Sequence, residues 1–280
     1  MQMKSTVKII SLAAVALFLS ILFYACSKDN SATTSVPSGS QDLSLYLTDA
    51  PARFNEVLVD IQSVQVLVDT CSNNSNFFHQ DSCNVWKSLN VTPGIYNLLT
   101  LQNGADTMFA GATVPAGNIL FIKLTLGPND SLVKDSVTYP LMLRDSSVVL
   151  VDVSRNRWDQ FEPRRFRLWL DFDVSRSIIN VHDNQFYLDP FIRVFTVSIT
   201  GSVSGDIWPG SALPVVTVYN SSDTAYAIPS WGGFFEVRGL TPGTYSAFIN
   251  ASNGYADTTI MGINVTAGNE VNIGNIKLHQ

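Results

Sequence analysis

The stretch FRLWLDFDVSRSIINVHDNQFYLDPFIRVF, residues 166–195, carries the clearest secondary-structure signal in the chain. Its first half alternates, so that one face would carry Phe166, Leu168, Leu170, Phe172 and Val174 and the other Arg167, Trp169, Asp171 and Asp173. A period of two is typical of a strand with one buried and one exposed face. The stretch from Gln185 to Val197 alternates again around Pro190, which indicates an edge or bulged strand. We therefore predict two long strands joined by a polar turn.

Asp171 and Asp173 are the most informative charges in this stretch. Their spacing places both carboxylates on the solvent face of the predicted strand, beside Trp169. Carboxylate oxygens are calcium ligands, and an exposed indole is a platform for sugars. The alternative is a solvated strand face with the tryptophan covered by a loop. We favour that alternative, so we predict no metal and no cofactor and keep these three residues as candidate ligand contacts.

Composition indicates an all-β protein that does not bind nucleic acid. Of the 280 residues, 46% are hydrophobic and 11% aromatic, and Gly or Pro interrupts the chain at short intervals. This pattern favours many short strands. The net charge of −6 and the pI near 4.9 argue against nucleic acid or an anionic membrane as an electrostatic partner.

The N-terminus reads as a lipoprotein signal peptide over residues 1–25. Lys4 and Lys8 precede an apolar run of 17 residues, Ile9–Ala25, which ends directly before Cys26. This order is typical of a secretory leader whose cysteine becomes the lipidated mature N-terminus. The alternative, an uncleaved anchor, is less favoured because a membrane span needs about 20 apolar residues.

The residues after Cys26 predict the location of the protein. Ser27-Lys28-Asp29-Asn30 resembles the surface-export signal of lipoproteins in the Bacteroidota. The resemblance implies a protein that is anchored in the outer membrane and faces the cell exterior. Residues 26–41 are small and polar, so we expect a flexible tether there.

Cys71 and Cys83 are the two cysteines that remain after lipidation. In an oxidising compartment two cysteines this close in sequence are expected to form a disulfide. His79 lies between them, which raises the alternative of a metal site. Two cysteines and one histidine without a second pair are poor zinc spacing, so we favour the disulfide.

The remaining patterns divide the chain into two β-sandwich domains, residues 42–196 and 197–280. In the first, the phase of the apolar residues shifts across Gln62-Ser63, which predicts a β-bulge or a corner. Ile95–Leu101 fits either a strand or one helical turn. From Val197 the strands become shorter and evenly spaced, as in a small Greek-key sandwich.

Three motifs resemble those of domain of unknown function family 4382. They are Leu47-Thr48-Asp49-Ala50-Pro51, Leu98-Leu99-Thr100-Leu101-Gln102-Asn103-Gly104, and Leu170-Asp171-Phe172-Asp173 with Ser177-Ile178 before Pro190-Phe191-Ile192-Arg193. The resemblance covers about Asp42–Phe195. It implies a secreted or lipid-anchored protein and supplies no activity.

The C-terminal part resembles the carboxypeptidase regulatory-like domain, a transthyretin-like sandwich. The matching segments are Ile199–Val203, Gly233-Phe234-Phe235 and Leu240–Tyr245. The resemblance implies a structural or presenting module. Trp208 and Trp231 fall in its predicted loops, where they would either stack on sugar rings or fill a domain interface.

No catalytic motif emerges from the sequence. Gly201-Ser202-Val203-Ser204-Gly205 has valine at the nucleophile position of a hydrolase elbow, and the histidines His79, His182 and His279 are scattered. We therefore predict a non-catalytic, lipid-anchored surface protein that acts as an adhesive, assembly or presenting module. The alternative is a glycan-binding lipoprotein that captures polysaccharide for a partner transporter through Trp169, Trp208 or Trp231.

Overall fold

The computed structural model describes residues 36–50, 52–71, 83–155, 158–182 and 184–280. The predicted signal peptide, the lipidation site Cys26 and the tether up to residue 35 lie outside the described residues, as does His79. The fold begins inside the predicted tether, because Val36 is buried and β1 starts at Ser40. In the described part of the chain, none of the helices has the length and apolar character that a membrane crossing requires.

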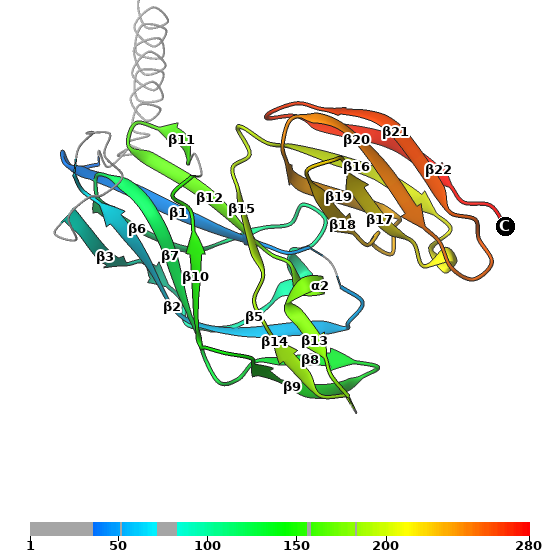
Figure 1. The fold of residues 1–280 in the computed structure, drawn as a ribbon, viewed down its shortest axis with the longest axis horizontal. Coiled ribbons are helices and arrows are strands. Elements are labelled where there is room, and N and C mark those ends of the chain that lie inside the picture. Colours follow the sequence, from blue (N-terminus) through cyan, green and yellow to red (C-terminus); the bar gives the residue numbers. More distant parts are fainter. Residues whose placement is uncertain (1–35, 51, 72–82, 156–157, 183) are drawn as a thin grey trace, which may run out of the picture. The chain divides into compact units, whose positions relative to one another are not determined.

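The described residues form an all-β protein, as predicted (Figure 1). Its first sandwich packs two sheets, coloured blue to yellow-green in the figure. The first sheet has the order β11-β12-β1-β6-β4, with β15 also paired to β12. Its strands are β1 (Ser40–Thr48), β4 (Asn90–Val91), β6 (Thr107–Pro115), β11 (Asp159–Glu162), β12 (Arg165–Phe172) and β15 (Ile192–Phe195).

The second sheet of this sandwich has the order β10-β7-β2-β8-β9-β14-β13, with β3 and β5 also paired to β2. Its strands are β2 (Glu56–Asp69), β3 (Asn84–Ser88), β5 (Gly94–Asn97), β7 (Asn118–Leu126), β8 (Ser131–Lys134), β9 (Val137–Leu143), β10 (Val148–Asp152), β13 (Ile178–Asn180) and β14 (Phe186–Leu188). The register of β2 against β7 shifts between Ile61 and Ser63, which confirms the predicted bulge.

The parallel pairing of β1 with β12 builds the centre of the first sheet. Leu45 lies opposite Leu168 and Leu47 opposite Leu170, and these leucines are fully buried in the core between the two sheets. The predicted inward face of β12 is therefore confirmed. Because the strands run in the same direction, their C-terminal ends, Thr48 and Asp171, lie side by side.

Two local predictions are wrong, and a third, which left a strand and a helical turn open, is resolved. Beyond Phe172 the chain leaves the strand, and Val174–Ser177 form the short helix α2. Pro190 does not lie within one long strand: it separates β14 from β15, which belong to different sheets. The ambiguous segment 95–101 is both elements in turn, because β5 is followed by the 3-10 helix η2 (Leu98–Leu101), which Asn97 caps.

The second sandwich, yellow to red in Figure 1, also has two sheets. One has the order β19-β16-β22 and the other β18-β17-β20-β21. The elements are β16 (Gly201–Trp208), η3 (Gly210–Ala212), β17 (Val215–Tyr219), β18 (Thr224–Ala227), β19 (Phe234–Leu240), β20 (Gly243–Asn250), β21 (Thr258–Val265) and β22 (Glu270–Lys277). Its apolar core is a separate cluster around Phe235 and Tyr245. The domain boundary at residues 196 and 197 stays a prediction.

Replacing Phe172, whose ring is buried in the first core, tests the inward face of β12. We expect Phe172→Ala to lower the free energy of unfolding by about 3 to 5 kcal/mol, because a large ring is lost from a packed core. Met261→Ala is the control, since Met261 is mostly exposed on β21 and should change stability by less than about 0.5 kcal/mol. Equal effects in urea unfolding would contradict the assignment.

Candidate functional site

The three motifs of the family resemblance meet at the ends of β1 and β12. The hydroxyl of Thr48 donates to the carbonyls of Leu101, at 3.1 Å, and Ala105, at 2.9 Å. The backbone N–H of Asp49 also donates to Leu101, at 3.1 Å. Motifs far apart in sequence therefore surround three acidic side chains, Asp49, Asp171 and Asp173, which we call the carboxylate cluster.

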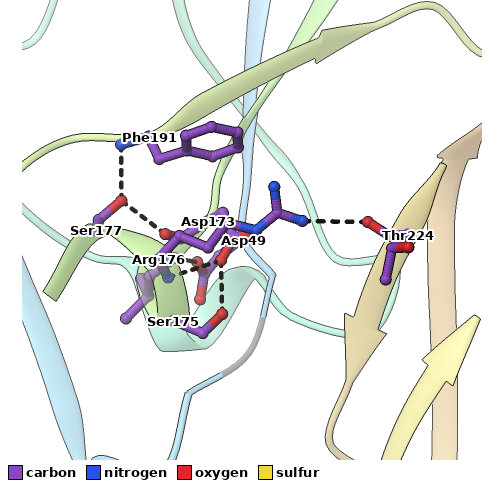
Figure 2. A network of polar contacts seen from close by, with 8 residues as sticks. Asp49, Asp173, Ser175, Arg176, Ser177, Phe191 and Thr224 are labelled. Atoms are coloured by element: carbon purple, nitrogen blue, oxygen red, sulfur yellow. Dashed lines mark hydrogen bonds and ion pairs between the residues drawn. The ribbon is translucent and has the colours of Figure 1, made fainter. Parts of the chain in front are cut away.

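Asp173 caps helix α2. Its carboxylate accepts hydrogen bonds from the backbone of Arg176, at 3.1 Å, and from the Ser175 hydroxyl, at 2.7 Å, and it pairs with Arg176 Nε at 3.0 Å. Figure 2 shows this arrangement, with the Arg176 guanidinium reaching on to the carbonyl of Thr224 in the second sandwich, at 3.1 Å. Asp173 is only 1% exposed, so the predicted solvated face is wrong at this residue.

Ser177 ties the same helix to the chain before β15. Its hydroxyl donates to the carbonyl of Asp173, at 2.6 Å, and accepts from the N–H of Phe191, at 2.9 Å (Figure 2). Asp173 and Ser177 therefore fix where the chain enters and leaves α2, which is a structural role.

Asp49 is the most strongly perturbed acid of the cluster. It is buried, and its Oδ1 accepts a hydrogen bond of 3.3 Å from the N–H of Val174, while Oδ2 accepts one of 3.4 Å from the side chain of Gln102. Burial raises the pKa of Asp49 well above its usual range, and the neighbouring charge of Asp171 raises the pKa further. In the sequence, Asp49 stood out only as part of the Leu47–Pro51 motif of the family resemblance.

Asp171 lies beside Asp49 and opposite Arg193 of β15. It is 8% exposed, so the prediction of a solvated carboxylate is wrong here too. Burial raises the pKa of Asp171 to about 6, although the Arg193 charge and a hydrogen bond from the N–H of Ala50 act to lower the pKa. Its Oδ1 atom is buried and has no hydrogen-bond partner among the described residues.

The raised pKa of Asp171 makes the stability of the protein depend on pH. Below about pH 4 the carboxyl is protonated in the folded and the unfolded chain, so it carries no penalty. Between pH 4 and pH 6 the unfolded chain loses this proton first, and the free energy of unfolding should fall by roughly 3 kcal/mol. Denaturant unfolding in chelator should show a smaller fall for Asp171→Asn, and identical pH profiles would refute the assignment.

Trp169 is buried at 5% exposure, so it is not the sugar platform that the sequence suggested as one alternative. Its ring stacks on Tyr46 and Phe195, with centroids 5.1 and 6.1 Å away. Its Nε1 donates to Asp106 Oδ2 at 2.8 Å. Arg238 of the second sandwich lies 5.9 Å from the same ring and covers the face of β12 that we predicted to be exposed.

Arg238 is one of several polar links between the two sandwiches, beside Asn103, Arg176 and Arg53. Its Nη1 donates to Asp106 Oδ2, at 2.8 Å, and to the carbonyl of Gly104, at 3.0 Å. The guanidinium therefore shares one carboxylate oxygen with Trp169. No sequence pattern predicts this contact, because Asp106 and Arg238 lie 132 positions apart.

The Asn103-Gly104 turn of the first sandwich contacts the second sandwich, and we call this region of contact the junction. The Asn103 amide donates to the carbonyl of Ile228, at 3.1 Å, and accepts from the N–H of Glu236, at 3.3 Å. Its side chain thus satisfies backbone groups in the segment after β18 and in β19. Gly104 has φ +83°, and a Cβ there would lie 2.0 Å from the Glu236 carboxylate, so the turn requires glycine.

Trp208 and Trp231 lie at the other end of β16 and β19. Trp208 is 45% exposed and packs against Gly233, since a Cβ on Gly233 would be 2.9 Å from its ring. Trp231 is fully exposed in the turn before β19, where Ser230 and Phe234 are bonded through their backbones. The structure therefore brings these two predicted contacts together at one end, which we call the tryptophan end, and leaves Trp169 apart.

The structure joins Cys71 to Cys83 with a Cα–Cα distance of 5.6 Å, which confirms the predicted disulfide. Asp69 lies beside them. In the described part of the chain, these three residues form the one group of three or more acidic, histidine or cysteine side chains whose ligating atoms all lie within 4.8 Å of one another. Metal binding requires a free thiolate, and the disulfide removes it.

Replacing Arg238 tests the junction. Arg238→Ala should lower the free energy of unfolding by about 1.5 to 3 kcal/mol, because charge-assisted hydrogen bonds to a partly buried carboxylate are lost. The backbone amide of Glu236 should also exchange its hydrogen faster. Arg144→Ala is the control, since its pair with Asp189 is exposed and should contribute less than about 1 kcal/mol. Unchanged exchange at Glu236 would contradict a role in joining the sandwiches.

Comparison with protein families finds one match. The model of the family described as Domain of unknown function (DUF4382) matches residues 40–190, which is more than half of the chain. The match covers the carboxylate cluster and ends before the second sandwich, whose resemblance to the carboxypeptidase regulatory-like domain stays a prediction. A comparison with curated proteins found no match.

Solved structures show only distant likeness. The Bacillus anthracis TIE protein has 13% identity and a TM-score of 0.22, with 86% of this chain and 34% of that chain covered. The minor pilin GBS52 of Streptococcus agalactiae has 14% identity and a TM-score of 0.22, with coverage of 85% and 96%. The shaft pilin SpaA of Lactobacillus rhamnosus GG has 10% identity and a TM-score of 0.23, with coverage of 85% and 97%. Scores this low carry no inference about function.

Proposed function

This chain belongs to the family described as Domain of unknown function (DUF4382), and we propose that it is a non-catalytic surface protein that presents its tryptophan end to a partner. In this proposal Cys26 is lipidated in the outer membrane and the folded chain faces the cell exterior. The protein then acts as an adhesive, assembly or presenting module. The observation that carries the proposal is the exposed pair Trp208 and Trp231 on a sandwich that is held to its neighbour.

The junction supports a presenting role. Arg238 and Asn103 connect the sandwiches close to β19. Arg176 of α2 adds a hydrogen bond to the carbonyl of Thr224 in β18. Contacts from several elements restrict relative motion more than a single linker does. A restricted second sandwich holds its tryptophan end in a constant direction relative to the first.

The roles of the polar residues support a non-catalytic protein. Asp173 caps a helix and Asp106 bonds Trp169 and Arg238, so both carboxylates serve the fold. The Gly201–Gly205 segment lies in β16, and the buried hydroxyl of Ser204 donates to Glu270. A serine in the middle of a strand lacks the strand-to-helix turn that exposes a nucleophile.

Glycan capture is the second candidate function. Its support is Trp231, whose indole is fully exposed, at the same end of the sandwich as the half-exposed Trp208. Exposed indoles offer a broad apolar face with a polar N–H, which suits stacking on a sugar ring. Trp169 no longer belongs to this candidate because Arg238 and Phe195 cover its ring. A partner transporter for the captured polysaccharide remains part of this second proposal.

A glycan array with the mature chain in detergent separates the two candidates. We expect no glycan signal if the tryptophan end binds or assembles with proteins. If glycan capture is the function, Trp231→Ala should weaken binding up to about tenfold, because one stacking ring is lost. Trp86→Ala is the matched control, since Trp86 is 40% exposed in the first sandwich, away from this end. Glycan binding that Trp231→Ala weakens and Trp86→Ala leaves intact would replace the first proposal by the second.

A further inference from the structure

A small cavity lies between the carboxylate cluster and the second sandwich. Its volume is about 30 Å³, and its lining includes Asp49, Asp171, Asn103, Glu236 and Arg238. This space holds roughly one water-sized particle. The walls contribute carboxylate and amide oxygens from both sandwiches, so the occupant is expected to be small and to interact with oxygen ligands.

One oxygen in this region lacks a partner. Asp171 is more than nine-tenths buried and lines the cavity, and its Oδ1 makes no hydrogen bond among the described residues. Asp49 also lines the cavity, and among the described residues it accepts two long hydrogen bonds, at 3.3 and 3.4 Å. A buried carboxylate oxygen without a donor is costly unless a cation, a proton or water satisfies it.

The neighbouring cations leave this pair undercompensated. Arg176 pairs with Asp173 at 3.0 Å, and Arg238 pairs with Asp106 at 2.8 Å. Arg193 lies opposite Asp171 in the strand register, and the charges of Arg193 and, to a smaller extent, Arg176 both act to lower the pKa of Asp171. Asp49 forms no salt bridge among the described residues. The lining of the cavity adds one further acid, Glu236, and one base, Arg238, whose guanidinium pairs with Asp106.

We propose that Asp49 and Asp171 bind a calcium ion in this cavity, at the junction of the two sandwiches. Only oxygen ligands line the acidic side, and these favour hard cations over zinc or copper. Calcium tolerates irregular geometry, whereas magnesium requires a near-regular octahedron. This proposal goes beyond the presenting function and does not depend on it.

Backbone carbonyls and water would complete the ion's shell. Among the described residues, Asp49 and Asp171 do not form, with a third acidic, histidine or cysteine side chain, a group whose ligating atoms all lie within 4.8 Å. A site with two carboxylates binds weakly, in the range of roughly 0.1 to 1 mM that is typical of extracellular calcium modules. The ion would stabilise the junction without being required for folding.

Thermal melts of the mature chain in detergent test the proposal first. In about 2 mM calcium the melting temperature should rise by roughly 5 °C relative to chelator, because the ion binds only the folded protein. Asp49→Asn and Asp171→Asn should each remove the rise. Asp173→Asn is the matched control: this acid is also buried, at 1% exposure, but pairs with Arg176, so the rise should persist even if the variant is less stable.

Terbium luminescence gives a second readout that does not depend on stability. Trp169 lies two residues before Asp171 on the same strand, close enough to transfer excitation to a terbium ion in the site. We expect sensitised emission that calcium competes away and that Asp171→Asn abolishes. Three results would each overturn the proposal. The first is terbium emission that persists in Asp171→Asn, and the second is a melting temperature that calcium does not change. The third is a calcium effect that is the same in Asp49→Asn and Asp171→Asn as in the unaltered protein. A melting temperature that changes with pH but not with chelator would show that a proton, and not calcium, neutralises Asp49 and Asp171.

Discussion

The parallel pairing of β1 with β12 is the constraint on which the rest of this structure depends. Parallel strands end at the same edge of a sheet, so Thr48 and Asp49 come to lie beside Asp171. The segment Leu98–Gly104 then bonds to the end of β1, and α2 begins directly after β12. Three motifs that are separated by many residues in the sequence thereby form one site.

Burying acidic residues at this edge is costly, and the fold offsets that cost unevenly. The carboxylate of Asp173 is compensated, because the backbone N–H of Arg176 in α2 donates a hydrogen bond to it and the Arg176 guanidinium pairs with it. The carboxylates of Asp171 and Asp49 are less well compensated. Burial raises the pKa of both, although the charge of Arg193 acts to lower the pKa of Asp171. Poorly compensated buried charges are more typical of binding or switching sites than of a stability core. This imbalance within one cluster distinguishes the structural acid from the candidate ligands.

The second sandwich is what turns an exposed strand end into a buried one. Arg238 covers Trp169 and bonds to Asp106, while Asn103 supplies backbone-like hydrogen bonds to Ile228 and Glu236. The contact therefore protects part of the open edges of β18 and β19, which would otherwise be free to pair with other chains. The same contact leaves the opposite, tryptophan end of the sandwich exposed.

Local patterns in the sequence were sufficient for the all-β class, the inward face of β12, the bulge near Ser63 and the pairing of Cys71 with Cys83. Each of these follows from alternation or from short spacing, which act within a few residues. The burial of Trp169 and Asp171 could not be predicted in this way. Alternation reports which residues face the strand's own core, but only the tertiary structure decides whether a second layer covers the other face. Here that layer comes from Arg238, about 70 residues further along the chain, through a contact for which no short-range pattern exists.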